Sequence, residues 1–293
     1  MPPRLGGMAR QNGGVNPPLY RLRLGSEAAG QKGLSDAMFI TVIGFFTGIL
    51  IGLTGTGGGV LLTPLLMVLT PYPAVTLIGT DIVNGAFTKL LGVFEHRRLG
   101  QVRWRLATFL IVGTVPGTVG GILLLSFLKT RLAGGELDHF LRMVLGVTLF
   151  CVAILLPLVR LGKIKPPKTW LDAPGKGARL RLMAVGALVG FLVALTSIGS
   201  GSLLMVFLLL LTPYPLGELV GTDILYGLAT MALAGSLHVR MGHFDSSLFL
   251  HVVVGSLPGV VIGSRLTRII PERYFSWLFT VLYFSLGARL LVG

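Results

Sequence analysis

Residues 37–80 read AMFITVIGFFTGILIGLTGTGGGVLLTPLLMVLTPYPAVTLIGT, a run of 44 residues without Asp, Glu, Lys, Arg or His. One helix crosses a bilayer with about 20 apolar residues, so the run is long enough for more than one element. It is interrupted by the glycine-rich stretch Thr54–Gly59 and ended by Thr70-Pro71-Tyr72-Pro73. The pattern predicts a spanning helix over 37–54, a break, and a helix over 60–70 about half a bilayer long.

The whole chain of 293 residues has this apolar character, with 53% hydrophobic and 12% charged residues and a mean hydropathy of +0.82. Soluble domains carry about 25% charged residues, so soluble, disordered and coiled-coil proteins are excluded. The sequence predicts an all-α polytopic membrane protein. Further apolar segments are expected near 75–95, 105–128, 139–160, 182–197, 202–212, 216–238, 246–268 and 273–292.

Two polar stretches flank these segments. Residues 1–35 are rich in Gly, Pro and Arg and are predicted to be a disordered basic tail. Residues 161–181 form a basic linker, which we expect to be cytoplasmic. The net charge of +14 lies mostly between apolar runs, so it is expected to orient the protein in a lipid bilayer, and no nucleic-acid partner is expected.

The two apolar halves, 36–160 and 182–293, are internal repeats. Between positions 44 and 122 we count 33 identities in 79 positions with the residues 142 further on. Chance does not produce such a match without a gap, so the sequence indicates a duplication with about five helical segments per half. The shared motifs include Thr70-Pro71-Tyr72-Pro73 with Thr212-Pro213-Tyr214-Pro215, and Gly79-Thr80-Asp81 with Gly221-Thr222-Asp223.

The loop charges favour an inverted orientation of the second half. Loop 95–105 carries four arginines, whereas its counterpart 237–247 keeps only Arg240 and gains Asp245. In the next pair of loops, the positive charge is larger in the second half: 129–138 balances two basic against two acidic residues, whereas 265–273 has three arginines and one glutamate. Such an exchange of positive charge between loops is what the positive-inside rule requires of inverted repeats. A parallel arrangement of four crossings per half stays open, and it would place both the tail and the linker in the cytoplasm.

The two glycine breaks are candidate anion sites. An unwound backbone is tolerated in hydrocarbon only where it lines a cavity or is buried in protein, and the half-helix after each break offers free N–H groups and a positive dipole end. The alternative is that the glycines only permit close helix packing. The candidate ligands are Thr54, Thr56, Gly57, Gly58 and Gly59 in the first discontinuous or re-entrant element, Thr196, Ser197, Gly199, Ser200 and Gly201 in the second, and Asn84, with a further hydroxyl at Ser202.

Asp81 and Asp223 are candidate coupling residues, because a carboxylate inside a membrane segment is costly and usually functional. A helix N-cap is the alternative role for each. Lys89 lies eight residues after Asp81 on the same predicted helix face, and Met231 takes its place in the second half. Lys89 is expected either to pair with Asp81 or to extend its amine to the membrane surface.

His96 and Arg98 recur as His238 and Arg240 near predicted helix ends. A pair of cations at each mouth could attract or gate an anion, and interfacial anchoring is the alternative. No enzymatic function is expected, because the stretch Gly55–Gly59 lacks the preceding strand and the following Lys of nucleotide-binding loops. No metal-ligand spacing is present either, so no cofactor is expected.

Two copies of a glycine-rich break, a half-helix, a T-P-Y-P turn, a G-T-D and an H-x-R-x-G motif resemble the TauE/SafE sulfite exporter family. The resemblance covers 37–292 apart from the linker, and the second copy departs from it at Ser200 and Tyr226, which replace Gly58 and Asn84. It implies a multi-pass transporter of the bacterial inner membrane that exports sulfite or organosulfonates such as sulfoacetate. Protons are a candidate coupling ion, which the Asp or His residues named above could relay. An anion channel or importer for the same substrates, and a membrane-embedded enzyme subunit, are the alternatives.

Overall fold

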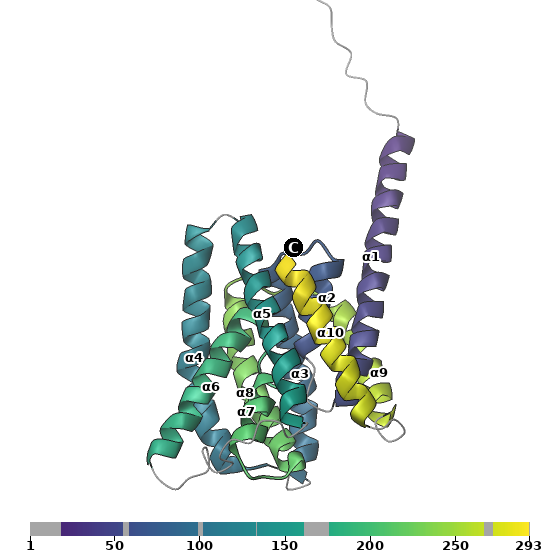
Figure 1. Cartoon of the computed structure of the whole chain (residues 1–293). Helices are drawn as coiled ribbons and strands as arrows, with labels where there is room; N and C mark the ends of the chain where they lie inside the picture. The colour runs from purple at the N-terminus through teal and green to yellow at the C-terminus, as the bar shows by residue number, and fades with distance from the viewer. Residues whose placement is uncertain are drawn as a thin grey trace, which may run out of the picture. The chain divides into compact units, whose positions relative to one another are not determined.

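The computed structural model describes residues 19–54, 59–98, 102–132, 134–160, 176–266 and 272–292. The chain divides into two units, Met1–Met38 and Phe39–Gly293, and the contacts below lie within the second. The described residues form ten helices (Figure 1). These are α1 (Leu19–Thr54), α2 (Gly59–Leu69), α3 (Ala74–Arg98), α4 (Trp104–Arg131), α5 (Gly134–Arg160), α6 (Lys176–Thr196), α7 (Leu203–Leu211), α8 (Leu216–Arg240), α9 (Ser246–Leu266) and α10 (Glu272–Val292).

The order of the helices follows the predicted apolar segments, but α1 begins earlier than expected. It starts at Leu19, so residues 19–35, which the composition assigned to an irregular tail, are helical in the structure. Leu, Arg, Glu, Ala and Lys in this stretch are good helix formers, and the apolar helix that follows supplies an existing end on which further turns add without a new nucleation step.

Six of the described helical stretches are long and apolar enough to cross a membrane: Ser35–Leu53, Trp104–Arg131, Gly135–Val159, Lys176–Thr196, Leu216–Arg240 and Ser246–Leu266. Their outward sides carry exposed apolar side chains at helical spacing. On α4 these are Val112, Val115, Val119 and Leu123, which form one stripe. Such a surface suits contact with lipid, so the chain is a multi-pass membrane protein.

Helices α4 and α6 lie side by side and run parallel, with small residues at the contact (Figure 1). Gly113 packs on the backbone of Met183, and Gly117 packs on that of Ala187 one turn further along both helices. A Cβ atom at either glycine would overlap the partner's backbone. The glycines therefore set how closely these two helices approach.

The same contact recurs between α9 and α1. The residues of α9 lie 142 positions after their counterparts in α4, and those of α1 lie 142 positions before their counterparts in α6. Gly255 packs on the backbone of Thr41, and Gly259 packs on that of Phe45. Helices in the first half of the sequence therefore form these close seams with helices of the second half.

Helices α3 and α8 pack antiparallel in the interior. A Cβ atom at Gly85 would stand 2.5 Å from the sulfur of Met231, and one at Gly227 would stand 2.7 Å from Cε of Lys89. From the first contact to the second, the residue number increases along α3, from 85 to 89, and decreases along α8, from 231 to 227. Because Gly85 and Gly227, like Lys89 and Met231, are 142 residues apart, the two contacts are counterparts of each other.

Helices α5 and α10 also run antiparallel, with Gly146 near Leu291 and Phe150 near Phe284 (Figure 1). The short helices α2 and α7 lie within two residues of the predicted 60–70 and 202–212. At 1.5 Å per residue they are about 16 and 13 Å long. Among the described residues, the buried aspartate and lysine side chains, Asp81, Lys89 and Asp223, lie on α3 and α8, so these two helices carry the ionisable carboxyl and amine groups of the interior.

Candidate functional site

The second break joins α6 to α7 through a buried, non-helical backbone. Ser197 has φ 62° and Gly201 has φ 88°, both in the left-handed region. The N–H of Leu204 donates to the carbonyl oxygen of Gly199 at 2.9 Å, so the chain turns tightly before α7 starts. All residues from 196 to 202 are buried, as expected of unwound backbone inside a membrane protein.

Asp81 connects this break to the first half of the chain. Its Oδ2 accepts hydrogen bonds from Thr63 on α2 at 2.5 Å and from Ser197 at 2.6 Å, and the two hydroxyls lie 2.9 Å apart. Asn84, three residues further along α3, also interacts with this carboxyl group. The predicted residues Asp81, Asn84 and Ser197 are therefore brought together, and Thr63 joins them.

Asp223 connects α8 to the start of α7. Its Oδ1 accepts the backbone N–H of Gly201 at 2.9 Å, and its Oδ2 has no hydrogen-bond partner among the residues that the structure describes. Both aspartates lie inside α3 and α8 rather than at their N-termini, so neither caps its own helix. Asp223 instead satisfies an N–H group near the end of another helix.

Lys89 is the predicted residue whose surroundings differ most from expectation. Its side chain is 1% exposed, so it does not reach the membrane surface. Its electrostatic partner is Asp223 on α8, not Asp81 on its own helix. The antiparallel packing of α3 on α8 brings the amine beside Gly227, one turn after Asp223.

The first break is bounded by Thr54, the last residue of α1, and Gly59, the first residue of α2. Thr56, Gly57 and Gly58 lie outside the described residues. Their predicted role as anion ligands therefore stays a prediction.

The hydroxyls of the second break divide into two groups. Thr196 bonds to Leu192 and Ile198 of its own turn, and Ser197 bonds to Asp81. The hydroxyls of Ser200 and Ser202 are buried and have no hydrogen-bond partner among the described residues. A buried hydroxyl without a partner is unfavourable, so these two are the groups in this break that a ligand could satisfy.

The paired histidine and arginine of the second half do not lie together. His238 is fully buried and its Nε2 lies 2.9 Å from the carbonyl oxygen of Ala194, whereas Arg240 is exposed at the end of α8. Their counterparts His96 and Arg98 belong to the last turn of α3, and their side chains lie outside the described set. A joint cation pair is therefore not formed at the α8 end.

A basic cluster that sequence patterns did not reveal lies beside His238. The rings of His238 and His243 are 5.4 Å apart, and the amine of Lys129 lies 3.1 Å from Nε2 of His243. Burial, with the nearby His238 and Lys129, lowers the pKa of His243 to about 4. The imidazole is therefore neutral at pH 7 and accepts a hydrogen bond from the lysine.

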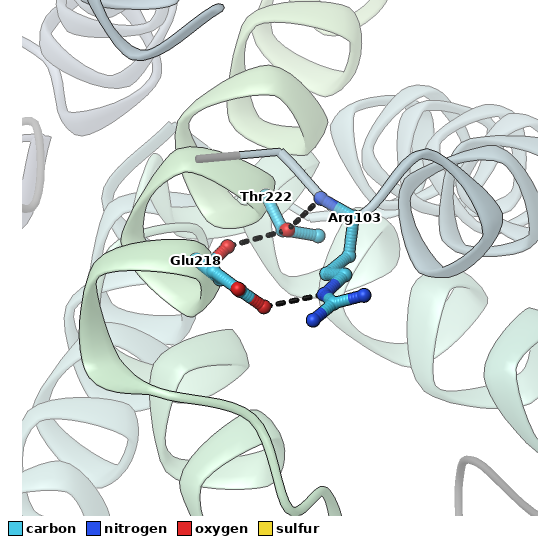
Figure 2. A network of polar contacts seen from close by, with 3 residues as sticks. All are labelled: Arg103, Glu218 and Thr222. Carbon is cyan, nitrogen blue, oxygen red and sulfur yellow. Dashed lines mark hydrogen bonds and ion pairs between the residues drawn. The ribbon is translucent and has the colours of Figure 1, made fainter. Parts of the chain in front are cut away.

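The loops before α4 and α9 bind the facing helices at counterpart positions. The N–H of Arg103 donates to Thr222 Oγ1 at 3.0 Å, and the N–H of Asp245 donates to Thr80 Oγ1 at 3.1 Å. Figure 2 shows that Arg103 also reaches the side chain of Glu218, forming an ion pair. The backbone contact is common to both halves, whereas the ion pair belongs to one.

Tyr226, which replaces Asn84 in the second half, ties helices together instead of facing an aspartate. Its hydroxyl donates to the carbonyl oxygen of Gly186 at 2.8 Å and lies 3.0 Å from Thr114 Oγ1. It therefore links α8 to α4 and α6. The two half-sites differ chemically at this position, as the sequence departure predicts.

Comparison with known proteins supplies the biological context. The sequence profile described as "Sulfite exporter TauE/SafE" matches residues 40–290. The chain is 35% identical over 254 residues to the "Probable membrane transporter protein YjnA" of Bacillus subtilis, covering 86% of this chain and 98% of that protein. It is 29% identical over 238 residues to the "Probable membrane transporter protein YdhB" of the same organism, covering 80% and 92%.

A more distant relative comes from an archaeon. The "Probable membrane transporter protein MJ0441" of Methanocaldococcus jannaschii is 23% identical over 192 residues, which is 63% of this chain and 66% of that protein. No solved structure matches. Since the family profile spans nearly the whole helical part, and a relative of more than 30% identity is covered end to end, this chain is a membrane transporter that belongs to the TauE/SafE sulfite exporter family.

Proposed function

We propose that this protein is a secondary transporter that exports sulfite or organosulfonates, such as sulfoacetate, across the bacterial inner membrane. The family description supplies the substrate class, and we propose a transport role rather than an enzymatic one. A negative-inside potential favours export of an anion by about 2.3 kcal/mol per charge per 100 mV. Protons are the proposed coupling ion, with Asp81 and Asp223 as the groups that carry them.

The observation that carries the proposal is the state of the second break. It is buried, its backbone is unwound, and the Ser200 and Ser202 hydroxyls have no hydrogen-bond partner among the described residues. Hydroxyl and backbone N–H donors beside a half-helix N-terminus suit an oxyanion. We place the anion between this element and its counterpart at Thr54–Gly59.

We also propose that the two halves are inverted repeats with re-entrant elements. The antiparallel packing of α3 on α8 supports this, because the contact of Gly85 with Met231 recurs as the contact of Gly227 with Lys89 when each residue is shifted by 142. Lys89 of α3 contacts Gly227 of α8, and their counterparts Met231 of α8 and Gly85 of α3 contact each other. Such reciprocal contacts are typical of two elements related by a two-fold axis. When the related helices run antiparallel, the axis is perpendicular to them, which is the arrangement of inverted transporter repeats.

The test is flux through purified protein in liposomes, measured with sulfite, sulfoacetate, taurine and thiosulfate. We expect saturable flux of sulfite or a sulfonate that runs against its electrochemical gradient when a proton gradient is imposed. Flux that never saturates and only runs downhill would identify a channel instead. Failure of every anion in the panel to move would contradict the proposal.

A matched pair of variants tests the position of the site. We expect Ser200→Ala to weaken anion binding by about 1–2 kcal/mol, the scale of one hydrogen bond to a charged group. Ser236→Ala, which alters an exposed serine of α8 that bonds only to its own helix, is the control and should bind normally. Equal affinity in both variants would move the site away from the second break.

A further inference from the structure

Lys89 is a buried cation that packing alone does not require. Its counterpart in the second half is Met231, which occupies the corresponding position over Gly85 as Lys89 does over Gly227. An unbranched side chain of similar length therefore fills this place without a charge. Burying an ammonium group in a membrane interior is costly, so its presence indicates a role that methionine cannot perform.

Room for the amine is provided by Gly227. A Cβ atom there would stand 2.8 Å from Nζ of Lys89 and 2.7 Å from its Cε. Even alanine at 227 would displace the amine. The structure therefore accommodates the charged end of the side chain at a defined place beside α8, one turn from Asp223.

Asp223 connects this amine to the second break. The carboxyl group interacts electrostatically with Lys89 and accepts the N–H of Gly201 through Oδ1. On either side of Gly201 lie Ser200 and Ser202, whose buried hydroxyls have no hydrogen-bond partner among the described residues. Lys89 and the N–H of Gly201 thus both interact with Asp223, so α3, α8 and the α6–α7 connection contribute polar groups to one region.

We infer that Lys89 supplies the positive charge that binds the transported anion, and that Asp223 holds the lysine while the site is empty. This inference rests on the proposed function. The substrate oxyanion and the Asp223 carboxylate then compete for one ammonium group, while the hydroxyls and N–H groups of the break orient the anion. The site therefore selects for a formal negative charge and rejects neutral sulfur compounds of the same shape.

The first test is binding of methanesulfonate and of its neutral isostere methanesulfonamide to the detergent-purified protein, together with sulfite. We expect the wild-type protein to bind the two anions and not the sulfonamide. Lys89→Met should weaken anion binding about 100-fold or more, the scale of removing one partner of a buried ionic contact. Lys176→Met, at an exposed lysine of α6, is the matched control and should bind normally.

The second test separates an anion-binding lysine from a structural ion pair. Asp223→Asn should bind the anions at least as tightly as the wild-type protein, because the competitor for Lys89 is gone. The double variant Lys89→Met/Asp223→Asn removes both charges, so no unpaired charge remains to prevent folding. We expect it to be monodisperse and still unable to bind.

The outcomes distinguish the two proposals. Recovery of anion binding in the double variant would show that the pair is only structural and would overturn the inference, as would unchanged affinity in Lys89→Met. If the wild-type protein binds no anion of the wider panel, the proposed function itself fails. The wild-type protein could instead bind sulfite but bind methanesulfonate and methanesulfonamide with equal affinity. That result would leave the proposed function standing and would overturn the role of Lys89.

Discussion

The surroundings of Asp81 and Asp223 differ, although the two residues occupy counterpart positions in α3 and α8. Two hydroxyls, from Thr63 and Ser197, donate hydrogen bonds to Asp81, whereas Asp223 accepts a backbone N–H and interacts electrostatically with a buried lysine. The two positions are 142 residues apart in the sequence, yet the groups that surround them are chemically different. The surroundings of Asp81 are neutral apart from its own carboxyl group, whereas those of Asp223 contain the positively charged Lys89.

The largest expected effect concerns the orientation of the two halves, on which this comparison depends. In a Cys151→Ser background, which removes the single native cysteine, we expect Gly100→Cys to label only from the cytoplasm and Ser246→Cys only from outside. The reason is that inverted halves place the α3–α4 and α8–α9 connections on opposite sides. A membrane-impermeant thiol reagent on intact cells and on inverted vesicles measures this.

A Cys151→Ser protein without introduced cysteines is the control. Labelling of both introduced cysteines from the same side would mean that the halves are parallel, and the two aspartates would then not be related by inversion.

Removing each carboxyl group should expose the difference between the half-sites. Asp223→Ala removes the negative charge that interacts with the buried Lys89 and should lower the free energy of unfolding by about 3–5 kcal/mol. Asp81→Ala leaves two hydroxyls to find other partners and should lower it by about 1–3 kcal/mol. Chemical unfolding in detergent measures both, with the exposed Asp36→Ala as control. Equal losses would show that the lysine does not distinguish the two sites.

The two glycines that end the breaks provide a finer comparison. Gly201 has φ 88°, where a side chain is strained, whereas its counterpart Gly59 is the first residue of a helix. We expect Gly201→Ala to cost about 1–2 kcal/mol of stability and to impair transport, and Gly59→Ala to cost less stability because its helical position does not need a positive φ. Thermal unfolding and liposome flux of the two variants measure this. Equal stability and equal flux in the two variants would mean that the left-handed backbone conformation of Gly201 is not required.

The smallest expected effect is the pH dependence that His243 contributes. Its pKa lies at about 4 in the folded protein and at 6.5 ordinarily, so the unfolded chain takes up the proton first as pH falls. The stability from the neutral imidazole is fully present above pH 6.5 and is lost progressively as the pH falls from 6.5 toward 4. Thermal unfolding of His243→Gln should be flatter than that of the wild-type protein over this interval.

His251→Gln is the matched control, because that side chain bonds only to the carbonyl oxygen of Ser247 in its own helix. It should retain the wild-type pH dependence. If His243→Gln retains it too, the loss of stability in acid has another source.

Sequence patterns were sufficient for the elements of the fold, because hydrophobic runs and glycine or proline interruptions are local signals. The runs predict the order of all the described helices, including the short ones after each break. The start of α1 was missed, since a polar, glycine-containing stretch such as 19–35 carries no apolar period although many of its residues favour helix.

The contacts of the candidate site were harder to predict because they are not local. Spacing along α3 pointed Lys89 toward Asp81, but antiparallel packing directs it to Asp223, more than a hundred residues away. His238 follows the pattern of a residue at a helix end, yet the loop after α8 folds back and buries it beside His243. A charged residue inside an apolar segment was the one signal that identified Lys89.

The glycine seams have a consequence for how the chain is made. The glycines that let α9 approach α1 lie more than two hundred residues from their contacts on α1. At a synthesis rate of about 5–20 residues per second, α1 enters the membrane roughly 10–40 s before α9 exists. During that interval the face of α1 that later contacts α9 lacks that partner. If synthesis stops midway, α1 is left in the membrane without α9, in a state that membrane chaperones or proteases can recognise. Dividing the gene between its halves would likewise place helices that contact each other on two separate chains.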